Sequence, residues 1–217
     1  MRPPSRPLVL LAASAALVTG AAAASAAPKK PAPVKPVCNL VVDDAGDTFL
    51  LRNQEVPGVY GPQEDALDIV SADLASDTKR ITAVIRVKKL ATTIATGVGQ
   101  GYELQFLNDG ENTLYLSATI TNGTQAFSVG FRDPTANTAT SLGDASGVFD
   151  LAKNEVRISA PVSAFSAQGT GVKPGTLLSI GTITASRNLV AVNVFADVNE
   201  GGTTYKAGAP SCVKPGK

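Results

Sequence analysis

The sequence predicts an all-β protein that folds as an antiparallel, two-sheet, jelly-roll-like sandwich. Three observations indicate this fold class. Apolar and polar residues alternate along most segments of the chain, as they do in half-buried strands. Residues with turn chemistry separate these segments, and the period of an amphipathic helix is almost absent. Roughly ten strands joined by short turns are typical of a sandwich.

The expected strands are segments in which alternate residues are apolar, or which are apolar almost throughout. In chain order they are 39–43, 67–69 with the residues after it, 80–88, 102–106, 114–119, 127–132, 156–159, 176–185 and 189–195. Within 80–88, Val84 interrupts the polar face, so both faces of this strand are expected to be partly covered. The apolar run 189–195 favours a central strand.

Turn residues lie where the pattern requires them. Asn122-Gly123 provides two residues that tolerate positive φ, as a type I′ hairpin turn needs. Asn108-Asp109-Gly110 separates the preceding pair of strands, so 102–132 is expected to form a three-stranded meander. Pro161 ends a strand, and 162–168 is expected to form one helical turn.

The start of the chain has the features of a signal peptide. Arg2 and Arg6 form a basic region, 8–18 is an apolar core, and Ala24-Ser25-Ala26 fits a cleavage site. A cleaved signal peptide predicts a secreted, extracellular protein. The sequence has no second apolar stretch of about 18 residues, so no membrane span is expected.

The chain is expected to contain a signal peptide (1–26), a linker rich in proline and lysine (27–37) and one β-sandwich domain (38–213). The sequence has 19 basic and 18 acidic residues, and loss of Arg2 and Arg6 with the signal peptide leaves 17 basic residues and a net charge of −1. A nearly neutral protein is not strongly attracted to nucleic acid or anionic membranes, so neither is an expected partner.

The two cysteines, Cys38 and Cys212, lie at the two ends of the predicted domain. They do not have the C-x-x-C spacing of a redox pair, and the sequence contains no histidine to activate a thiol. A disulfide that joins the first and last parts of the domain is therefore expected, and it agrees with export.

Few residues are suited to enzymatic catalysis. Without histidine, a Ser-His-Asp triad is excluded and zinc or copper sites are disfavoured. Gly97, Gly99 and Gly101 lack the spacing of a phosphate-binding loop and precede a strand, not a helix. A non-catalytic protein is expected, with a hydrolase that uses a carboxylate pair as the alternative.

Three carboxylates, Asp43, Asp47 and Asp68, are expected at strand ends around the turn that contains Gly46. Hard cations such as Ca²⁺ bind about six to eight oxygen atoms, and carboxylates this close would repel one another without a cation. From chemistry alone, a cation site and a solvated acidic turn explain these residues equally well.

A second acidic segment, 197–202, matches part of a helix–loop–helix calcium loop. Gly208 stands where that loop requires its bidentate glutamate, so a hairpin turn is expected there.

The acidic turn also resembles a known motif. Asp43-Asp44-Ala45-Gly46-Asp47 followed by Leu67-Asp68-Ile69 resembles the D-P-x-G-D … L-D-I opening of secreted bacterial β-sandwich domains, similar to family-9 carbohydrate-binding modules and DOMON-like domains. The resemblance continues through 101–106 and 147–161. It implies a jelly-roll sandwich with a structural calcium ion whose ligands include Asp43, Asp47 and Asp68.

The chain departs from this group in ways that bear on its ligand. Asp44 replaces the usual proline, and 207–210 lacks an aspartate that some relatives have. Aromatic platforms for sugars are scarce, since there is no tryptophan and, of the four tyrosines, only Tyr60 and Tyr115 are expected to be exposed. Haem binding is excluded, because histidine is absent and the single methionine is Met1.

These observations predict a secreted, monomeric, non-catalytic module that acts in extracellular binding or in the cell envelope and holds a structural Ca²⁺. Its ligand is unknown, and a glycan or another secreted protein is expected. The alternatives are a carbohydrate-binding domain, a carboxylate-pair hydrolase and an inhibitor of a secreted enzyme.

Overall fold

The computed structural model of the protein describes residues 34–48, 64–94, 98–108, 112–133, 138–168, 171–188 and 193–216. These residues belong to one compact unit, Val34–Lys217. The predicted signal peptide (1–26), most of the predicted linker and Tyr60 lie outside the described residues.

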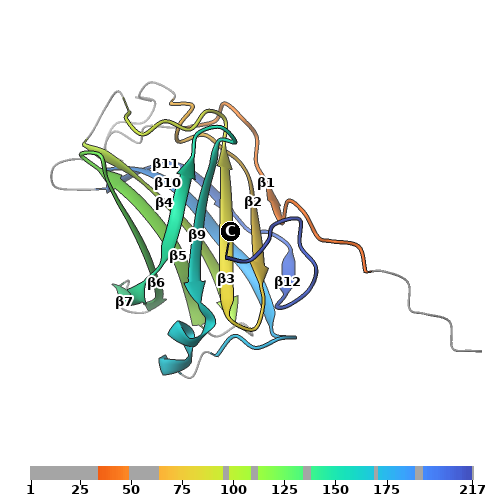
Figure 1. The fold of residues 1–217 in the computed structure, drawn as a ribbon. Helices are drawn as coiled ribbons and strands as arrows, with labels where there is room; N and C mark the ends of the chain where they lie inside the picture. Colours follow the sequence, from red (N-terminus) through yellow and green to blue (C-terminus); the bar gives the residue numbers. More distant parts are fainter. Residues whose placement is uncertain are drawn as a thin grey trace, which may run out of the picture. The chain divides into compact units, whose positions relative to one another are not determined.

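The fold-class prediction is confirmed, because the described residues form strands that pair antiparallel in two sheets. The smaller sheet has the order β1-β2-β3-β9-β8, and the larger has the order β11-β10-β4-β5-β6-β7, with β12 also paired to β10. Figure 1 shows the two layers. The strands are β1 (Val41–Val42), β2 (Ile69–Ser76), β3 (Arg80–Val87), β4 (Gly99–Asn108), β5 (Asn112–Thr121), β6 (Thr124–Asp133), β7 (Thr138–Asp144), β8 (Ser146–Asp150), β9 (Glu155–Pro161), β10 (Leu177–Asn188), β11 (Asn193–Glu200) and β12 (Thr204–Lys206).

The predicted meander is present as β4, β5 and β6, which are consecutive in the larger sheet. In the hairpin between β5 and β6, Asn122 and Gly123 have φ values of 49° and 80°, as a type I′ turn requires. The predicted central strand at 189–195 is wrong in its position. The described part of that run starts β11, which lies at the edge of the larger sheet beside β10.

The apolar residues of the two sheets face each other and form one core. Alternate residues of β4 and β5, among them Tyr102, Leu104 and Leu116, are almost fully buried. The predicted helical turn is a 3-10 helix, η1 (Val162–Gln168). Its Phe165 packs edge-on against Phe106, with 5.8 Å between the ring centroids. The helix therefore covers one end of the core.

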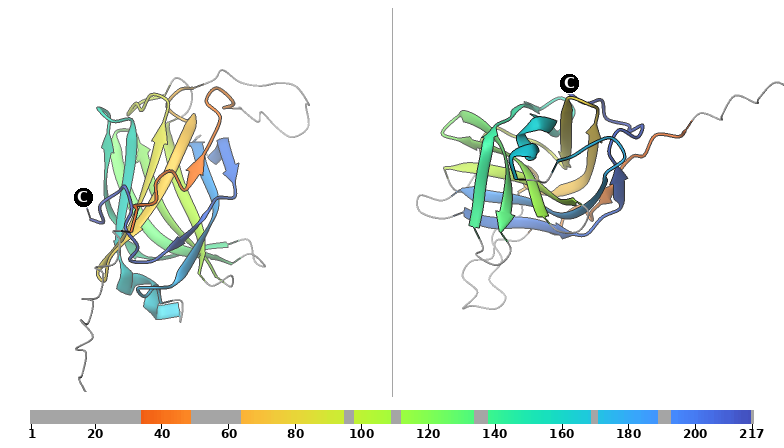
Figure 2. Two further views of the ribbon diagram at one scale, coloured as in Figure 1. Left: turned by 90° about the vertical axis from the view of Figure 1, so that its right-hand side faces the viewer. Right: turned by 90° about the horizontal axis from the view of Figure 1, so that it is seen from below.

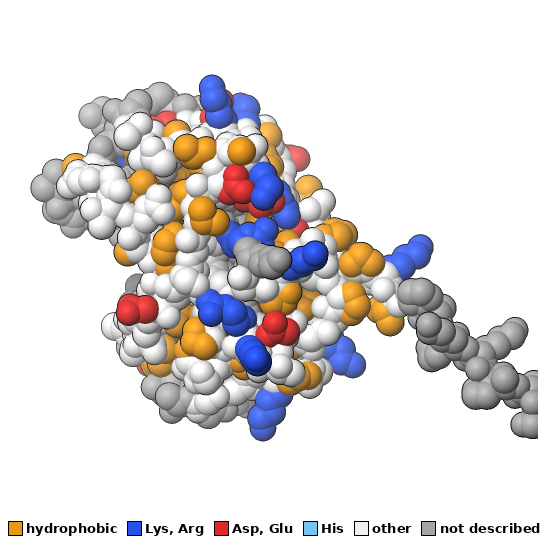
Figure 3. All heavy atoms as spheres, viewed as in Figure 1, with side chains coloured by type: hydrophobic (Ala, Val, Ile, Leu, Met, Phe, Trp, Pro, Cys, Tyr) orange, Lys and Arg blue, Asp and Glu red, His pale blue; other side chains and the backbone are white. Residues whose placement is uncertain are grey.

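The outer face of the smaller sheet carries the C-terminal segment, 211–216. Val213 packs against Ala75 and Val84 in a small apolar cluster on this face, and the Gly216 amide donates a hydrogen bond of 2.8 Å to Oγ1 of Thr82. The packing of Val213 on Val84 explains why an apolar residue interrupts the polar face of β3. Both faces of this strand are partly covered, as the sequence predicted. Basic and acidic side chains surround the segment on the same face (Figure 3).

The predicted disulfide between Cys38 and Cys212 is confirmed, with the two Cα atoms 5.2 Å apart. It is supported by a short parallel bridge, in which the Val37 amide donates to the Pro210 carbonyl and the Cys212 amide donates to the Val37 carbonyl. The two ends of the sandwich domain are thus joined covalently and by hydrogen bonds. No helix among the described residues is long and apolar enough to cross a membrane.

Candidate metal centre

The acidic turn starts where β1 ends, beside the edge of β2. The Asp43 amide donates a hydrogen bond of 3.2 Å to the Val70 carbonyl. The chain then turns at Gly46, whose φ of 97° lies in the region that favours glycine. The Gly46 amide donates to both carboxylate oxygens of Asp68, at 3.0 and 2.8 Å. The turn is therefore held against the residue that precedes β2.

Three carboxylates converge beside this turn. One oxygen from each of Asp43, Asp47 and Asp197 lies within 4.8 Å of the others. Asp43 and Asp47 come from the turn, whereas Asp197 comes from β11 in the larger sheet. Oδ2 of Asp197 accepts a hydrogen bond of 2.6 Å from the Ile69 amide at the start of β2. These three residues are called the acidic cluster below, and they connect the two sheets.

Two of the predicted ligands, Asp43 and Asp47, therefore lie together, and the third residue of the cluster is Asp197. The expectation of a hairpin turn at 197–202 is wrong for its first residues, since Asp197 and Asn199 lie within β11. One sequence signal could have identified Asp197. It is a lone acidic residue in a run of strand-forming residues, and an aspartate in such a position is seldom buried unless it has a partner.

Asp68 has a supporting position beside the cluster. Its side chain is almost fully buried, and both of its oxygens contact the Gly46 amide. Its Oδ2 also lies 3.7 Å from Nζ of Lys88, which pairs more closely with Asp65, at 2.8 Å. Asp68 thus sets the shape of the turn that carries Asp43 and Asp47.

The electrostatics of the cluster favour a bound cation. Burial raises the pKa of Asp197 to about 7, against the hydrogen bond from the Ile69 amide, and the carboxylates of Asp43, Asp47 and Asp68 raise it further. Burial and then Asp43 raise the pKa of Asp47 as well. Asp47 and Asp197 are therefore harder to ionise, and a cation between the carboxylates would relieve the repulsion.

Several oxygen atoms around the cluster lack partners. Within the described part of the chain, no hydrogen bond reaches the buried Oδ2 of Asp43, Oδ1 of Asp47 or Oγ1 of Thr48. A buried oxygen without a hydrogen-bond donor is costly, and coordination to a cation is one way to satisfy it. Ca²⁺–oxygen distances of about 2.3–2.6 Å place ligands on opposite sides of the ion about 5 Å apart, which fits the spacing within the cluster.

Two cavities formed by described residues lie apart from the acidic cluster. These cavities have volumes of about 270 and 210 Å³ and share Thr93 and Ile94 in their walls. Glu64 and Gln100 also line them, one in each cavity, whereas Asp43, Asp47 and Asp197 line neither.

Tyr115 does not provide an aromatic platform for a sugar, because only 6% of it is exposed. The guanidinium of Arg132 lies 5.6 Å from the centre of its ring, and Gly130 lies against its hydroxyl end. The expectation that Tyr115 is exposed is therefore wrong. Tyr115 does lie on the outer face of the larger sheet, as the alternation predicts. Residues of the neighbouring strand β6 cover its ring there.

Comparison with known proteins finds no matching family model, no matching curated protein and no matching solved structure.

Proposed function

We propose that this protein is a secreted, non-catalytic β-sandwich module in which Ca²⁺ binds to the acidic cluster and stabilises the fold. The observation that carries the proposal is the convergence of Asp43, Asp47 and Asp197 from two sheets, with buried oxygens that receive no hydrogen bond from the residues that the structure describes. The disulfide agrees with export to an oxidising environment. The partner of the module would be an extracellular glycan or another secreted protein.

The surroundings of the cluster support a structural role for the ion. Its ligands come from the N-terminal turn and from β11, so a bound ion connects elements that the chain itself does not connect locally. The Gly46 turn is already shaped by Asp68, which reduces the ordering that binding requires. The carboxylate oxygens of the three aspartates suit a hard cation.

Calcium titration tests the proposal. The purified mature domain is unfolded thermally in calcium and in chelator, and binding is measured by calorimetry. At a calcium concentration 100 times the dissociation constant, binding stabilises the folded state by about 2.7 kcal/mol. For a domain of this size, that corresponds to a rise in Tm of roughly 5–11 °C.

Two variants make the test specific. Asp43→Asn should abolish both the calorimetric signal and the rise in Tm, because it removes a ligand without changing the shape of the side chain. Asp44→Asn is the matched control, since Asp44 is exposed in the same turn and lies outside the cluster. A Tm that is equal in calcium and chelator, or equal calcium binding by both variants, would refute the calcium site.

A second candidate function rests on the close approach of Asp197 and Asp43, whose carboxylate oxygens lie within 4.8 Å of each other, together with the raised pKa of Asp197, since two neighbouring carboxyl groups are the arrangement of a carboxylate-pair hydrolase. A panel of glycoside and ester substrates tests it. Turnover that disappears in Asp197→Asn would establish hydrolysis and displace the structural proposal.

A further inference from the structure

The N-terminal segment 37–48, called the seam strap below, lies between the two sheets at the edge of β2. On one side, Val41 and Val42 pair with β2. On the other side, the Leu40 carbonyl accepts hydrogen bonds from the amide and hydroxyl groups of Thr203, at 3.0 and 3.2 Å. Figure 2 shows β1 at the side of the sandwich, next to strands of both layers. The seam strap therefore closes the opening between the sheets on this side.

The seam strap contributes little ordered backbone of its own. Its strand β1 contains only two residues, and a ladder this short is weak without other contacts. Leu40 and Val41 are buried in the core, and Val41 lies against Gly202, where a Cβ atom would be only 2.6 Å from it. The strap thus covers core residues, although the ladder that joins it to β2 is short.

Two chemically different links hold the strap at its ends. At its start, Cys38 is bonded to Cys212. Near its end, Asp43 and Asp47 form the acidic cluster with Asp197. The first link is broken by reduction and the second, under the function proposed above, by loss of calcium.

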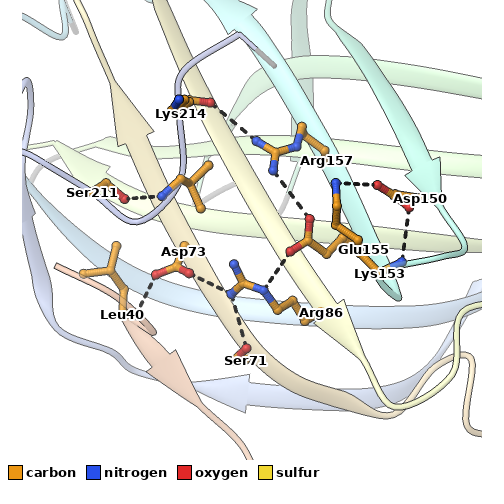
Figure 4. Close-up of polar contacts among 11 residues, drawn as sticks. Leu40, Ser71, Asp73, Arg86, Asp150, Lys153, Glu155, Arg157, Ser211 and Lys214 are labelled. Carbon is orange, nitrogen blue, oxygen red and sulfur yellow. Dashed lines mark hydrogen bonds and ion pairs between the residues drawn. The ribbon is translucent and has the colours of Figure 1, made fainter. Parts of the chain in front are cut away.

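The partner of the disulfide link, the C-terminal segment, has contacts of its own with the smaller sheet. The C-terminal segment is held by Val213 in its apolar cluster and by a hydrogen bond of 3.4 Å from Arg157 to the Lys214 carbonyl. Figure 4 shows how this contact continues through Glu155 and Arg86 across the smaller sheet.

This network of polar side chains reaches the strap through Asp73. Oδ1 of Asp73 accepts the Leu40 amide at 3.3 Å, while its Oδ2 pairs with Arg86 at 2.7 Å. Release of the strap would therefore leave the buried Asp73 paired with a cation. The sheet keeps its polar network, and the strap can leave without uncovering an unpaired charge.

We propose that the seam strap is a releasable segment that opens only when the disulfide is reduced and the calcium ion is lost together. This inference rests on the calcium site proposed above. While one link remains, the other end of the strap stays at a high effective concentration near its site and closes again readily. When both links are absent, the short β1 ladder, the hydrogen bonds of Val37, Leu40, Asp43 and Gly46, and the buried side chains of the strap oppose opening without a covalent or ionic link.

A reduced disulfide and a lack of calcium are the conditions inside a cell, and an intact disulfide with bound calcium matches the conditions outside it. The cytoplasm is reducing, and its free calcium is low enough that sensor proteins with micromolar affinity are empty at rest. A chain destined for export would have neither link there and both links outside. The seam would consequently close only after export.

Hydrogen exchange of the folded domain tests the release of the strap. Exchange is followed in four conditions, which combine calcium or chelator with oxidised or reduced cysteines. The amides of Leu40, Asp43 and Thr203 report on the strap, because each donates a hydrogen bond that joins the strap to the rest of the sandwich. The amides of β4 and β5 report on the rest of the sandwich.

With either link intact, exchange of the strap amides should rise by less than about tenfold. With both broken, it should rise by at least about a hundredfold, in line with the loss of effective concentration. Exchange in β4 and β5 should stay within about tenfold in every condition. Strap exchange that rises fully when one link is broken, or that does not rise when both are broken, would overturn the inference, as would equal loss of protection in β4 and β5.

A double variant without the disulfide, Cys38→Ser with Cys212→Ser, repeats the test without reductant. In this background, Asp47→Asn should release the strap even in calcium, whereas Asp44→Asn should not. Calorimetry separates the two possible failures. If calcium does not bind the oxidised protein, the proposed function fails and the inference fails with it. If calcium binds but the strap remains protected when both links are broken, only the inference fails.

Discussion

Glu64→Gln should destabilise the sandwich, because it leaves a buried arginine without its ionised partner. Nη2 of Arg187, on β10, donates a hydrogen bond of 2.7 Å to Oε1 of Glu64. The side chains of Arg187 and Glu64 are only 1% and 8% exposed. Arg187 pairs across the sheet with Gln100 and is buried, so its charge would lose its partner in a position shielded from bulk solvent.

The expected cost follows from this burial. Removal of one partner of a buried ion pair costs about 3–5 kcal/mol. Glutamine keeps the shape of the side chain and can still accept a hydrogen bond, so a cost of about 3 kcal/mol is expected at position 64. In a domain of this size, that should lower Tm by roughly 6–12 °C.

A second pair in the same protein provides the control. Arg132 Nε lies 2.7 Å from Oε1 of Glu103, the same distance, but Arg132 is 34% exposed there. Glu103→Gln should therefore cost less than about 1 kcal/mol. Urea unfolding of both variants at neutral pH measures the difference.

The double variant Glu64→Gln with Arg187→Met separates burial of a charge from simple loss of contact. It should recover about 2 kcal/mol relative to the single change, because no unpaired charge remains in the core. The reasoning would be refuted if the two glutamine variants cost the same, or if the double variant were no more stable than Glu64→Gln alone.

Three further predictions concern other parts of the sandwich. Burial, and then the charge of Glu64, raises the pKa of Tyr102 above its ordinary value of 10.0, so the stability that depends on its neutral form is complete below about pH 10 and is lost as the pH rises further. Urea unfolding between pH 9 and 11 should therefore show a smaller decline for Tyr102→Phe than for the natural protein, and parallel declines would contradict this. Gly147→Ala should cost roughly 1–3 kcal/mol in urea unfolding, because its Cβ would collide with the backbone carbonyl oxygen of Arg157 and with the ring of Phe127, and a neutral effect would contradict this close packing of β8 on β9. Gly123→Ala should lower stability by about 1 kcal/mol through its φ of 80°, although the space around it is open, and an unchanged unfolding midpoint would exclude strain at this turn.

Much of the fold could be predicted because strand and turn signals are local. The alternation in 80–88 and the Asn122-Gly123 turn each depend on neighbours within a few residues, and β3 and the hairpin from β5 to β6 follow them. The position of β11 could not be predicted in this way. An apolar run is expected for a central strand, but the neighbours of a strand depend on how the two sheets pack.

The exposure of Tyr115 shows the same limit at a single side chain. Its place on the polar face of β5 was clear from the alternation, and it does lie on the outer face of the sheet. Its burial comes from Arg132 and Gly130 on β6, which the sequence of β5 does not contain. Cross-strand neighbours therefore decide whether an outward-facing ring can contact a ligand.

The acidic cluster, likewise, could be predicted from the sequence only in part. The sequence alone determined the glycine turn, with Asp43 and Asp47 on either side of Gly46, and the absence of histidine that leaves oxygen as the main ligand type. Only the tertiary structure decided that Asp197 joins them and that Asp68 holds the turn from beside the cluster. The reason is physical. Asp197 meets the start of β2 through a hydrogen bond that spans 128 residues of sequence, and only the packing of two sheets on one core sets so distant a contact.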